Sequence, residues 1–114
     1  DYVAKVLIQI NDYKRAYKYL KSGYDIKSGA FKAKWLGTID LYNDKLESAE
    51  KYLNESLKYD ANDAQVWYNL AGVYVKRNDY KKALELVNKA LAIKSNYLEA
   101  IKLQTQLRNA VQSN

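Results

Sequence analysis

The sequence predicts an all-α fold built by repeating one helix–turn–helix unit. Asn-Asp-Tyr-Lys occurs twice, at residues 11–14 and 78–81, and a weaker copy, Asn-Asp-Lys-Leu, stands between them at 43–46. The outer copies are separated by two periods of about 34 residues, a length typical of solenoids whose stacked helical units bury a continuous core. Any function is therefore expected on the surface made by stacking rather than in an enclosed pocket.

The clearest unit runs from residue 64 to residue 97, and its first half has the pattern of an amphipathic helix. Four residues recur at the spacing i, i+3, i+4 and i+7, which places them on one face of a helix. These expected core residues are Trp67, Leu70, Ala71 and Tyr74. Asn78-Asp79 interrupts the pattern, and Asp79 is a suitable N-cap for a second helix. The apolar stripe of that second helix contributes two further expected core residues, Ala83 and Ala90.

The preceding unit, from residue 30 to residue 63, repeats the pattern with two unusual positions. In a continuous register Leu36-Gly37 matches the later Leu-Ala pair, but Ala33 and Asp40 stand at the places of the Trp and the Tyr. A second register shifts the first helix by one residue and aligns the Asn-Asp turns instead. In this shifted register Trp35 and Ile39 would be core residues. The continuous register is preferred because it keeps Leu36-Gly37 aligned.

The two ends of the chain differ in their expected roles. Residues 1–29 are interpreted as a truncated first unit, and residue 1 falls inside its first helix, so we interpret the chain as a piece of a longer protein. Residues 98–114 begin a further copy, but polar residues replace its apolar stripe at Gln104, Thr105 and Arg108. Such a helix is expected to cap the array against solvent.

The unit of residues 64–97 resembles the tetratricopeptide repeat, whose pattern is Trp, Leu-Gly, Tyr, Ala, an aromatic residue and Pro over about 34 residues. The expected core residues stand at the matching spacings, while Ala71 replaces the Gly and Ser95 stands where Pro commonly ends the repeat. The resemblance implies a right-handed α-solenoid of about three helix–turn–helix units plus a C-terminal capping helix. It also implies a non-catalytic scaffold or adaptor for protein–protein interaction.

In the family that this repeat resembles, the first helices of successive units line a concave groove. The resemblance therefore implies a peptide-binding face, and the residues carried over to it are Tyr2, Lys5, Phe31, Lys34, Trp35, Tyr42, Tyr68, Asn69, Lys76 and Lys102. An exposed apolar patch that needs a use is expected from Phe31, Trp35, Leu41, Tyr42, Tyr68 and Val75. The alternative is that Phe31, Trp35 and Tyr42 belong to the core through the shifted register, or are covered by an upstream segment.

The expected partner is a peptide or protein with apolar and acidic residues, because lysines edge the aromatic face. Some members of the resembled family bind a terminal carboxylate through two Lys, two Asn and one Arg. Lys34, Asn69 and Lys102 stand at three of those places, whereas Trp35 and Gln106 replace the second Asn and the Arg. A mixed aromatic and basic groove is therefore preferred to a carboxylate clamp. The competing interpretation is a structural role in self-assembly or in packing within a longer protein.

Composition and charge exclude several other classes of function. The chain lacks Cys and His, the residues that most often act as nucleophile, general base or metal ligand. No enzyme activity, metal site, cofactor or small-molecule substrate is therefore expected. No run of about 18 apolar residues exists, so membrane insertion is not expected. The compartment stays open, with the cytoplasm as the default and a bacterial periplasm as the alternative.

Nucleic-acid binding is the lesser alternative. The net charge is +6, but most of it comes from Lys, and the unit of residues 30–63 is acidic. A nucleic-acid surface is expected to carry a continuous basic stripe with clustered Arg. The lysines are therefore interpreted as mostly solvated helix faces.

Overall fold

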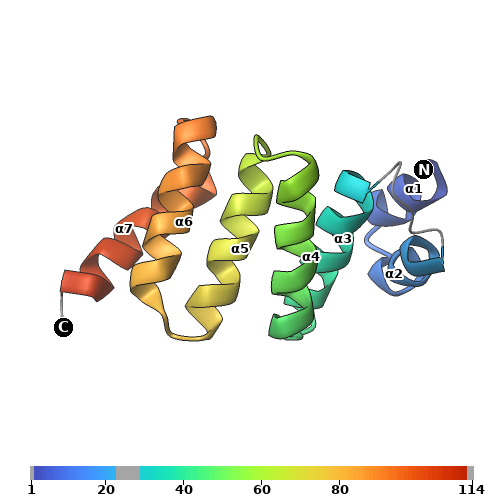
Figure 1. Ribbon diagram of the computed structural model, residues 1–114, viewed down its shortest axis with the longest axis horizontal. Helices are drawn as coiled ribbons and strands as arrows, with labels where there is room; N and C mark the ends of the chain where they lie inside the picture. Colours follow the sequence, from blue (N-terminus) through green and yellow to red (C-terminus); the bar gives the residue numbers. More distant parts are fainter. Residues whose placement is uncertain (1, 23–28, 113–114) are drawn as a thin grey trace.

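The computed structural model describes residues 2–22 and 29–112, apart from the side chains of Tyr2 and Ser22, as a row of helices (Figure 1). Within these residues no strand occurs. The helices are α1 (Tyr2–Gln9), α2 (Tyr13–Ser22), α3 (Gly29–Tyr42), α4 (Leu46–Tyr59), α5 (Ala64–Lys76), α6 (Tyr80–Ile93) and α7 (Leu98–Gln112). The array measures 44 × 25 × 25 Å along its principal axes. The predicted all-α solenoid is confirmed.

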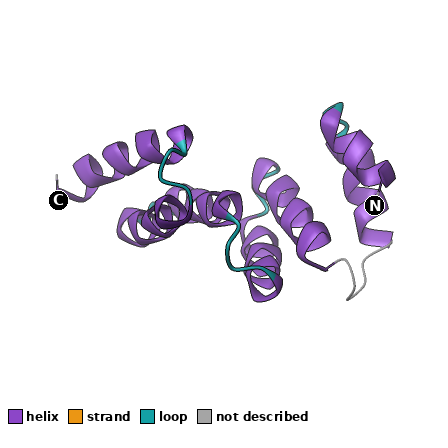
Figure 2. Cartoon of the chain, turned by 90° about the horizontal axis from the view of Figure 1, so that it is seen from above, coloured by secondary structure: helices purple, strands orange, loops and turns teal. Residues whose placement is uncertain are grey.

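Successive helices pack as pairs that stand side by side. Helix α1 contacts α2, α3 contacts α4, α5 contacts α6, and α7 lies against α6. The pairs join through contacts of α2 with α3 and of α4 with α5, while α3 also reaches α5 (Figure 2). The first helices α3 and α5 of two neighbouring pairs are therefore close enough to share one face.

The two helices of each pair are joined by the same tight turn, in which one residue has a left-handed backbone. The angle φ is 61° at Asn11, 59° at Asp44 and 63° at Asn78. In the last turn the N–H of Asp79 donates to the carbonyl of Tyr74 at 2.9 Å, which closes the end of α5 in the manner of a Schellman motif. Asn and Asp adopt this backbone more readily than other non-glycine residues.

The repeated Asn-Asp-Tyr sequence meets three requirements of this turn. The Asn takes the left-handed position, and the Asp caps the next helix, since its carboxylate accepts a backbone N–H at 3.2 Å in both copies. The Tyr hydroxyl then donates to the Asn side chain at 3.0 Å. Local hydrogen bonding therefore explains the most visible repeat in the sequence.

The middle turn shows which register the backbone follows. The left-handed residue is Asp44, which is 34 residues before Asn78, so the continuous register holds here. Helices α4 and α6 likewise begin and end 34 residues apart. The shifted register, which would align Asn43 with Asn78, is wrong at this turn. Lys45 stands at the cap position of α4 and makes no side-chain cap.

Two hydrophobic clusters form the interior. The N-terminal cluster consists of Ala4, Ala16, Leu20, Leu36 and Ile39. The larger C-terminal cluster extends from Leu41 on α3 to Leu107 on α7. The residues expected in the core fall into two groups. Those that are buried are Leu70, Ala71, Ala83 and Ala90. Trp67 and Tyr74 are half-buried and pack against the C-terminal cluster.

The polar groups of Trp67 and Tyr74 explain why these two rings, which were expected in the core, are only half-buried. The indole N–H of Trp67 donates to the carbonyl of Ala61 at 2.8 Å, and the hydroxyl of Tyr74 donates to the carboxylate of Glu50. An aromatic ring with a polar group packs its body against the core and keeps that group near a partner. At the place of Tyr74, the preceding pair has Asp40, which is buried and accepts hydrogen bonds from Tyr17 and Ser48.

Candidate interaction surface

The residues expected on a binding face are brought to the first helices, and their exposures differ. Phe31 and Trp35 on α3 are half-buried and pack against the N-terminal cluster, and Lys5 on α1 places its ammonium 5.5 Å from the Phe31 ring centroid. Lys102 lies exposed on α7. Tyr2 begins α1, and its side chain lies outside the described residues.

The expected exposed apolar patch is largely used in packing. Leu41 is 7% exposed and belongs to the C-terminal cluster, so its assignment to the exposed patch is wrong. Tyr68 and Val75 pack in part against the same cluster. Of the patch, Tyr42 is open, with 56% of its surface exposed. Neighbouring pairs approach closely enough that most of these side chains serve both the core and the surface.

Two of the expected binding lysines are already paired with aspartates. Lys34 lies 2.8 Å from the carboxylate of Asp63, and both side chains are mostly buried. Lys76 pairs with Asp44 and donates to the carbonyl of Leu41 at 3.1 Å. These contacts join one helix pair to the next. The lysines therefore stabilise the stacking and offer less open positive charge than their number suggests.

Asn69 lies between α3 and α5. It is 7% exposed, and its amide donates to the hydroxyl of Thr38 at 3.0 Å, which in turn donates to the carbonyl of Lys34 at 2.7 Å. A buried amide with a satisfied donor gains little by turning to a ligand. Of the three residues that matched a carboxylate clamp, Lys34 and Asn69 thus have internal partners.

A row of tyrosines crosses the molecule beside these residues. We define the tyrosine row as Tyr13, Tyr42, Tyr68 and Tyr97. The ring centroids of Tyr13 and Tyr42 are 5.5 Å apart, and those of Tyr68 and Tyr97 are 5.2 Å apart. Sequence reasoning did not single out Tyr97. The available signal was its position in the repeat. Tyr97 stands directly before α7, and the equivalent residue of the preceding unit is Asp63, which pairs with Lys34.

Burial and nearby groups raise the pKa values of Tyr42, Tyr68 and Tyr97. Burial raises the pKa of Tyr42, and the nearby hydroxyls of Tyr13 and Tyr68 add to the rise. The pKa of Tyr97 reaches about 12, mainly because the ring is buried and next because Tyr68 and Glu99 are close. Burial and Glu99 also raise the pKa of Tyr68. Ring contacts join the row in two pairs, Tyr13 with Tyr42 and Tyr68 with Tyr97.

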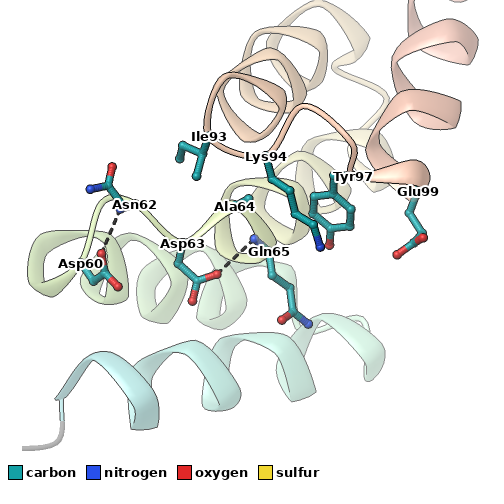
Figure 3. A pocket seen from close by; sticks show the side chains of 9 residues that line it. All are labelled: Asp60, Asn62, Asp63, Ala64, Gln65, Ile93, Lys94, Tyr97 and Glu99. Atoms are coloured by element: carbon teal, nitrogen blue, oxygen red, sulfur yellow. Dashed lines mark hydrogen bonds between the residues drawn. The ribbon is translucent and has the colours of Figure 1, made fainter.

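A hollow of about 570 Å³ opens at the C-terminal end of the row (Figure 3). Its lining residues are Asp60, Asn62, Asp63, Ala64, Gln65, Ile93, Lys94, Tyr97 and Glu99. They come from the α4–α5 connection, the start of α5, and the segment that joins α6 to α7. The lining thus brings the carboxylates of Asp60, Asp63 and Glu99, the ammonium of Lys94 and the ring of Tyr97 to one hollow, and Asp63 is already paired with Lys34.

The described residues offer no other obvious chemistry. Across residues 2–22 and 29–112, no three acidic side chains come together as a metal site would require. Among the same residues, no helix combines the length and apolar character of a membrane span. The tyrosine row and the charged side chains beside it are therefore the candidate interaction surface.

Comparison with known proteins points to one family. Residues 40–107 match the model of a family described as tetratricopeptide repeat. A search of curated protein sequences finds no match. A crystal structure of MamA aligns with a TM-score of 0.83 at 22% identity, and the alignment covers 96% of this chain and 64% of the other. The chain thus spans less than two thirds of the MamA length.

Two other solved structures carry peptides. The first TPR of Spaghetti (RPAP3) bound to the HSP90 peptide SRMEEVD aligns with a TM-score of 0.85 at 13% identity, covering 96% of this chain and 87% of the other. The second TPR domain of human RPAP3, in complex with the HSP70 peptide SGPTIEEVD, aligns with a TM-score of 0.79 at 14% identity, covering 92% and 88%. At these identities the likeness is one of fold.

Proposed function

Because the chain belongs to the tetratricopeptide repeat family, we propose that it is a non-catalytic adaptor that binds a peptide segment or a protein partner on its concave face. Modules of this family are generally devoted to protein–protein interaction. We place the contact surface on the first helices of the pairs, α1, α3, α5 and α7, as the family resemblance implies.

The tyrosine row is the observation that carries this proposal. Tyrosine is enriched where proteins bind one another, because its ring offers apolar area and its hydroxyl a hydrogen bond. The row crosses successive helix pairs, so an extended peptide could contact several rings at once. The fold likeness to the peptide-bound RPAP3 domains supports the same kind of use.

Substitution of Tyr68 tests the proposal. A dodecapeptide phage library would be panned against the folded chain, and the affinities of selected peptides would be measured by fluorescence anisotropy. Peptide grooves typically give micromolar affinity, and loss of one anchor ring should weaken binding about tenfold. Tyr68→Ala should show this loss. Tyr59→Ala should bind normally, because Tyr59 is on α4 and outside the row.

A thermal melt of each variant separates lost binding from lost folding. Tyr68 packs in part against the C-terminal cluster, so Tyr68→Phe serves as a second variant that keeps the ring. Selected peptides that bind parent, Tyr68→Ala and Tyr59→Ala equally would move the contact surface elsewhere.

Self-assembly is the second candidate, and exposed apolar residues at the two ends favour it. Val3 on α1 and Ile10 directly after it are 45% and 62% exposed, and on α7, Leu98 and Ile101 are 58% and 38% exposed. These end faces could pack against another copy or another segment. Light scattering across a concentration series tests this role. A mass that rises with concentration and falls in Leu98→Lys would support assembly, whereas a constant monomer mass would reject it.

A further inference from the structure

The charges along the proposed groove are distributed unevenly, and this bears on the chemistry of the partner. The expectation of an acidic partner rested on lysines along the groove. Lys34 and Lys76 are each neutralised by an aspartate of a neighbouring element. The positive charge that remains open near the tyrosine row is therefore smaller than the sequence suggests.

The C-terminal end of the row has the opposite character. Tyr97 forms one wall of the hollow and is 9% exposed, and its ring centroid lies 5.2 Å from that of Tyr68. Asp60, Asp63 and Glu99 line the same hollow; Asp63 is paired with Lys34, which leaves the carboxylates of Asp60 and Glu99 beside the ammonium of Lys94. Glu99 follows Tyr97 by two residues and lines the same hollow, and burial together with Glu99 raises the pKa of Tyr68.

A tyrosine ring beside a carboxylate is suited to a cation. Cations bind the negative face of an aromatic ring, and a carboxylate adds a charge-assisted hydrogen bond. The chain itself already contains this arrangement at another place. The guanidinium of Arg77 lies 5.4 Å from the Tyr74 ring centroid and 2.7 Å from the carboxylate of Glu50.

The hollow also already holds one cation of the chain. The ammonium of Lys94 lies 5.0 Å from the ring centroid of Tyr97, and Figure 3 shows the Lys94 side chain extending beside that ring. Lys94 is exposed and stands at the C-cap of α6. A lysine side chain at such a position can move aside at small cost, and a planar guanidinium would use the ring face better.

We propose that the hollow between Tyr97 and Glu99 binds a basic side chain, most suitably an arginine, of the peptide that occupies the groove. This inference rests on the proposed function, because it assigns the chemistry of one position in the bound peptide. The complementary charges and the aromatic wall argue for this occupant over an acidic one. The partner then differs from the acidic peptides bound by the RPAP3 domains.

A double-mutant cycle tests the assignment. Peptides from the dodecapeptide library panned on the parent chain should be enriched in Arg or Lys at one position. Replacing that residue by Ala in a selected peptide should lower affinity about tenfold, as should Glu99→Gln against the unchanged peptide. Together the two changes should cost little more than either alone. Glu85→Gln is the matched control, because Glu85 is exposed on α6 and pairs with Lys82.

The outcomes separate this inference from the proposed function. Peptides that need Tyr68 but are enriched in Asp or Glu, or that lose affinity additively in the cycle, would overturn the basic anchor and leave the groove intact. Peptides indifferent to Tyr68 would overturn both. A further expected result is tighter binding by Lys94→Ala, about threefold, because the competing ammonium is removed. Weaker binding by that variant would count against the assignment.

Discussion

At the scale of single residues, the turns rely on one left-handed residue followed by one helix cap. Asp79 caps α6 through its carboxylate, whereas Lys45 makes no side-chain cap although its backbone has nearly the same angles. The sequence predicted the Asp79 cap because the residue type is diagnostic. It could not place the middle turn by letters alone, since Asn43-Asp44 resembles Asn78-Asp79 while the backbone equates Asp44 with Asn78.

The missing cap predicts a stabilising substitution. Lys45→Asn should raise the free energy of unfolding by about 1 kcal/mol, because an Asn side chain at this position can accept a backbone N–H of α4. Asn avoids adding negative charge beside Asp44 and Glu47. Urea denaturation measures the change, with Lys45→Ala as the control that removes the lysine and adds no cap. Equal stability of the two variants would mean that the cap is not formed.

The tyrosines predict a loss of stability in alkali. Burial, helped by the hydrogen bond to Asp40, raises the pKa of Tyr17 to about 12, and burial raises that of Tyr97 to about 12. Unfolded tyrosine titrates near pH 10, so the unfolded chain loses protons first as the pH rises. These two tyrosines should therefore leave the free energy of unfolding unchanged from neutral pH to about pH 10 and lower it between about pH 10 and 12. Tyr97→Phe should make this fall shallower, as measured by urea denaturation at each pH.

At the scale of helices, close packing between paired helices depends on small residues. A Cβ atom at Gly37 on α3 would lie 2.7 Å from the Cγ of Leu53 and 3.0 Å from its backbone nitrogen on α4. A Cβ atom at Gly72 on α5 would lie 3.4 Å from the Cδ2 of Leu41, which is an ordinary van der Waals contact. The Leu-Gly signature thus predicted a contact that the structure contains. The sequence could not show that only one of the two glycines is sterically required.

These glycines predict opposite effects of the same substitution. Gly37→Ala should lower the free energy of unfolding by about 1 to 3 kcal/mol, because the backbone of Leu53 cannot move away cheaply. Gly72→Ala should raise it by up to about 1 kcal/mol, because alanine favours a helix interior and meets no obstacle. Thermal and urea denaturation of both variants provide the measurement. A stabilised Gly37→Ala would contradict the packing of α3 on α4.

At the scale of the whole molecule, the core is distributed unevenly along the array. The first pair contributes to the N-terminal cluster through Ala4, Ala16 and Leu20, whereas the C-terminal cluster draws large residues from α3 to α7. Local stability in solenoids follows each unit and its neighbours. Amides of α1 and α2 should therefore exchange with deuterium faster than those of α5 and α6. Uniform protection along the chain would contradict this expectation.

The proposed binding face was predictable in outline and not in detail. Helix periodicity and the family resemblance assigned Tyr42 and Tyr68 to the first helices. The partners of the lysines depend on how helix pairs stack, and Lys34 meets Asp63 across 29 positions of sequence. The same holds for Asn69 and Thr38. Contacts of this kind have no local signal, so the reduced positive charge of the groove and the part played by Tyr97 emerged only from the structure.

A partner that binds along the tyrosine row should change the environment of its rings, and ring chemical shifts measure that change. The chain labelled with ¹³C in its tyrosine rings would be titrated with a library-selected peptide, with spectra assigned by single Tyr→Phe variants. The account predicts shifts in the rings of Tyr42, Tyr68 and Tyr97, while Tyr19 on α2 and Tyr59 on α4 stay unchanged. Saturable shifts confined to Tyr19 or Tyr59, with the row unaffected, would contradict it.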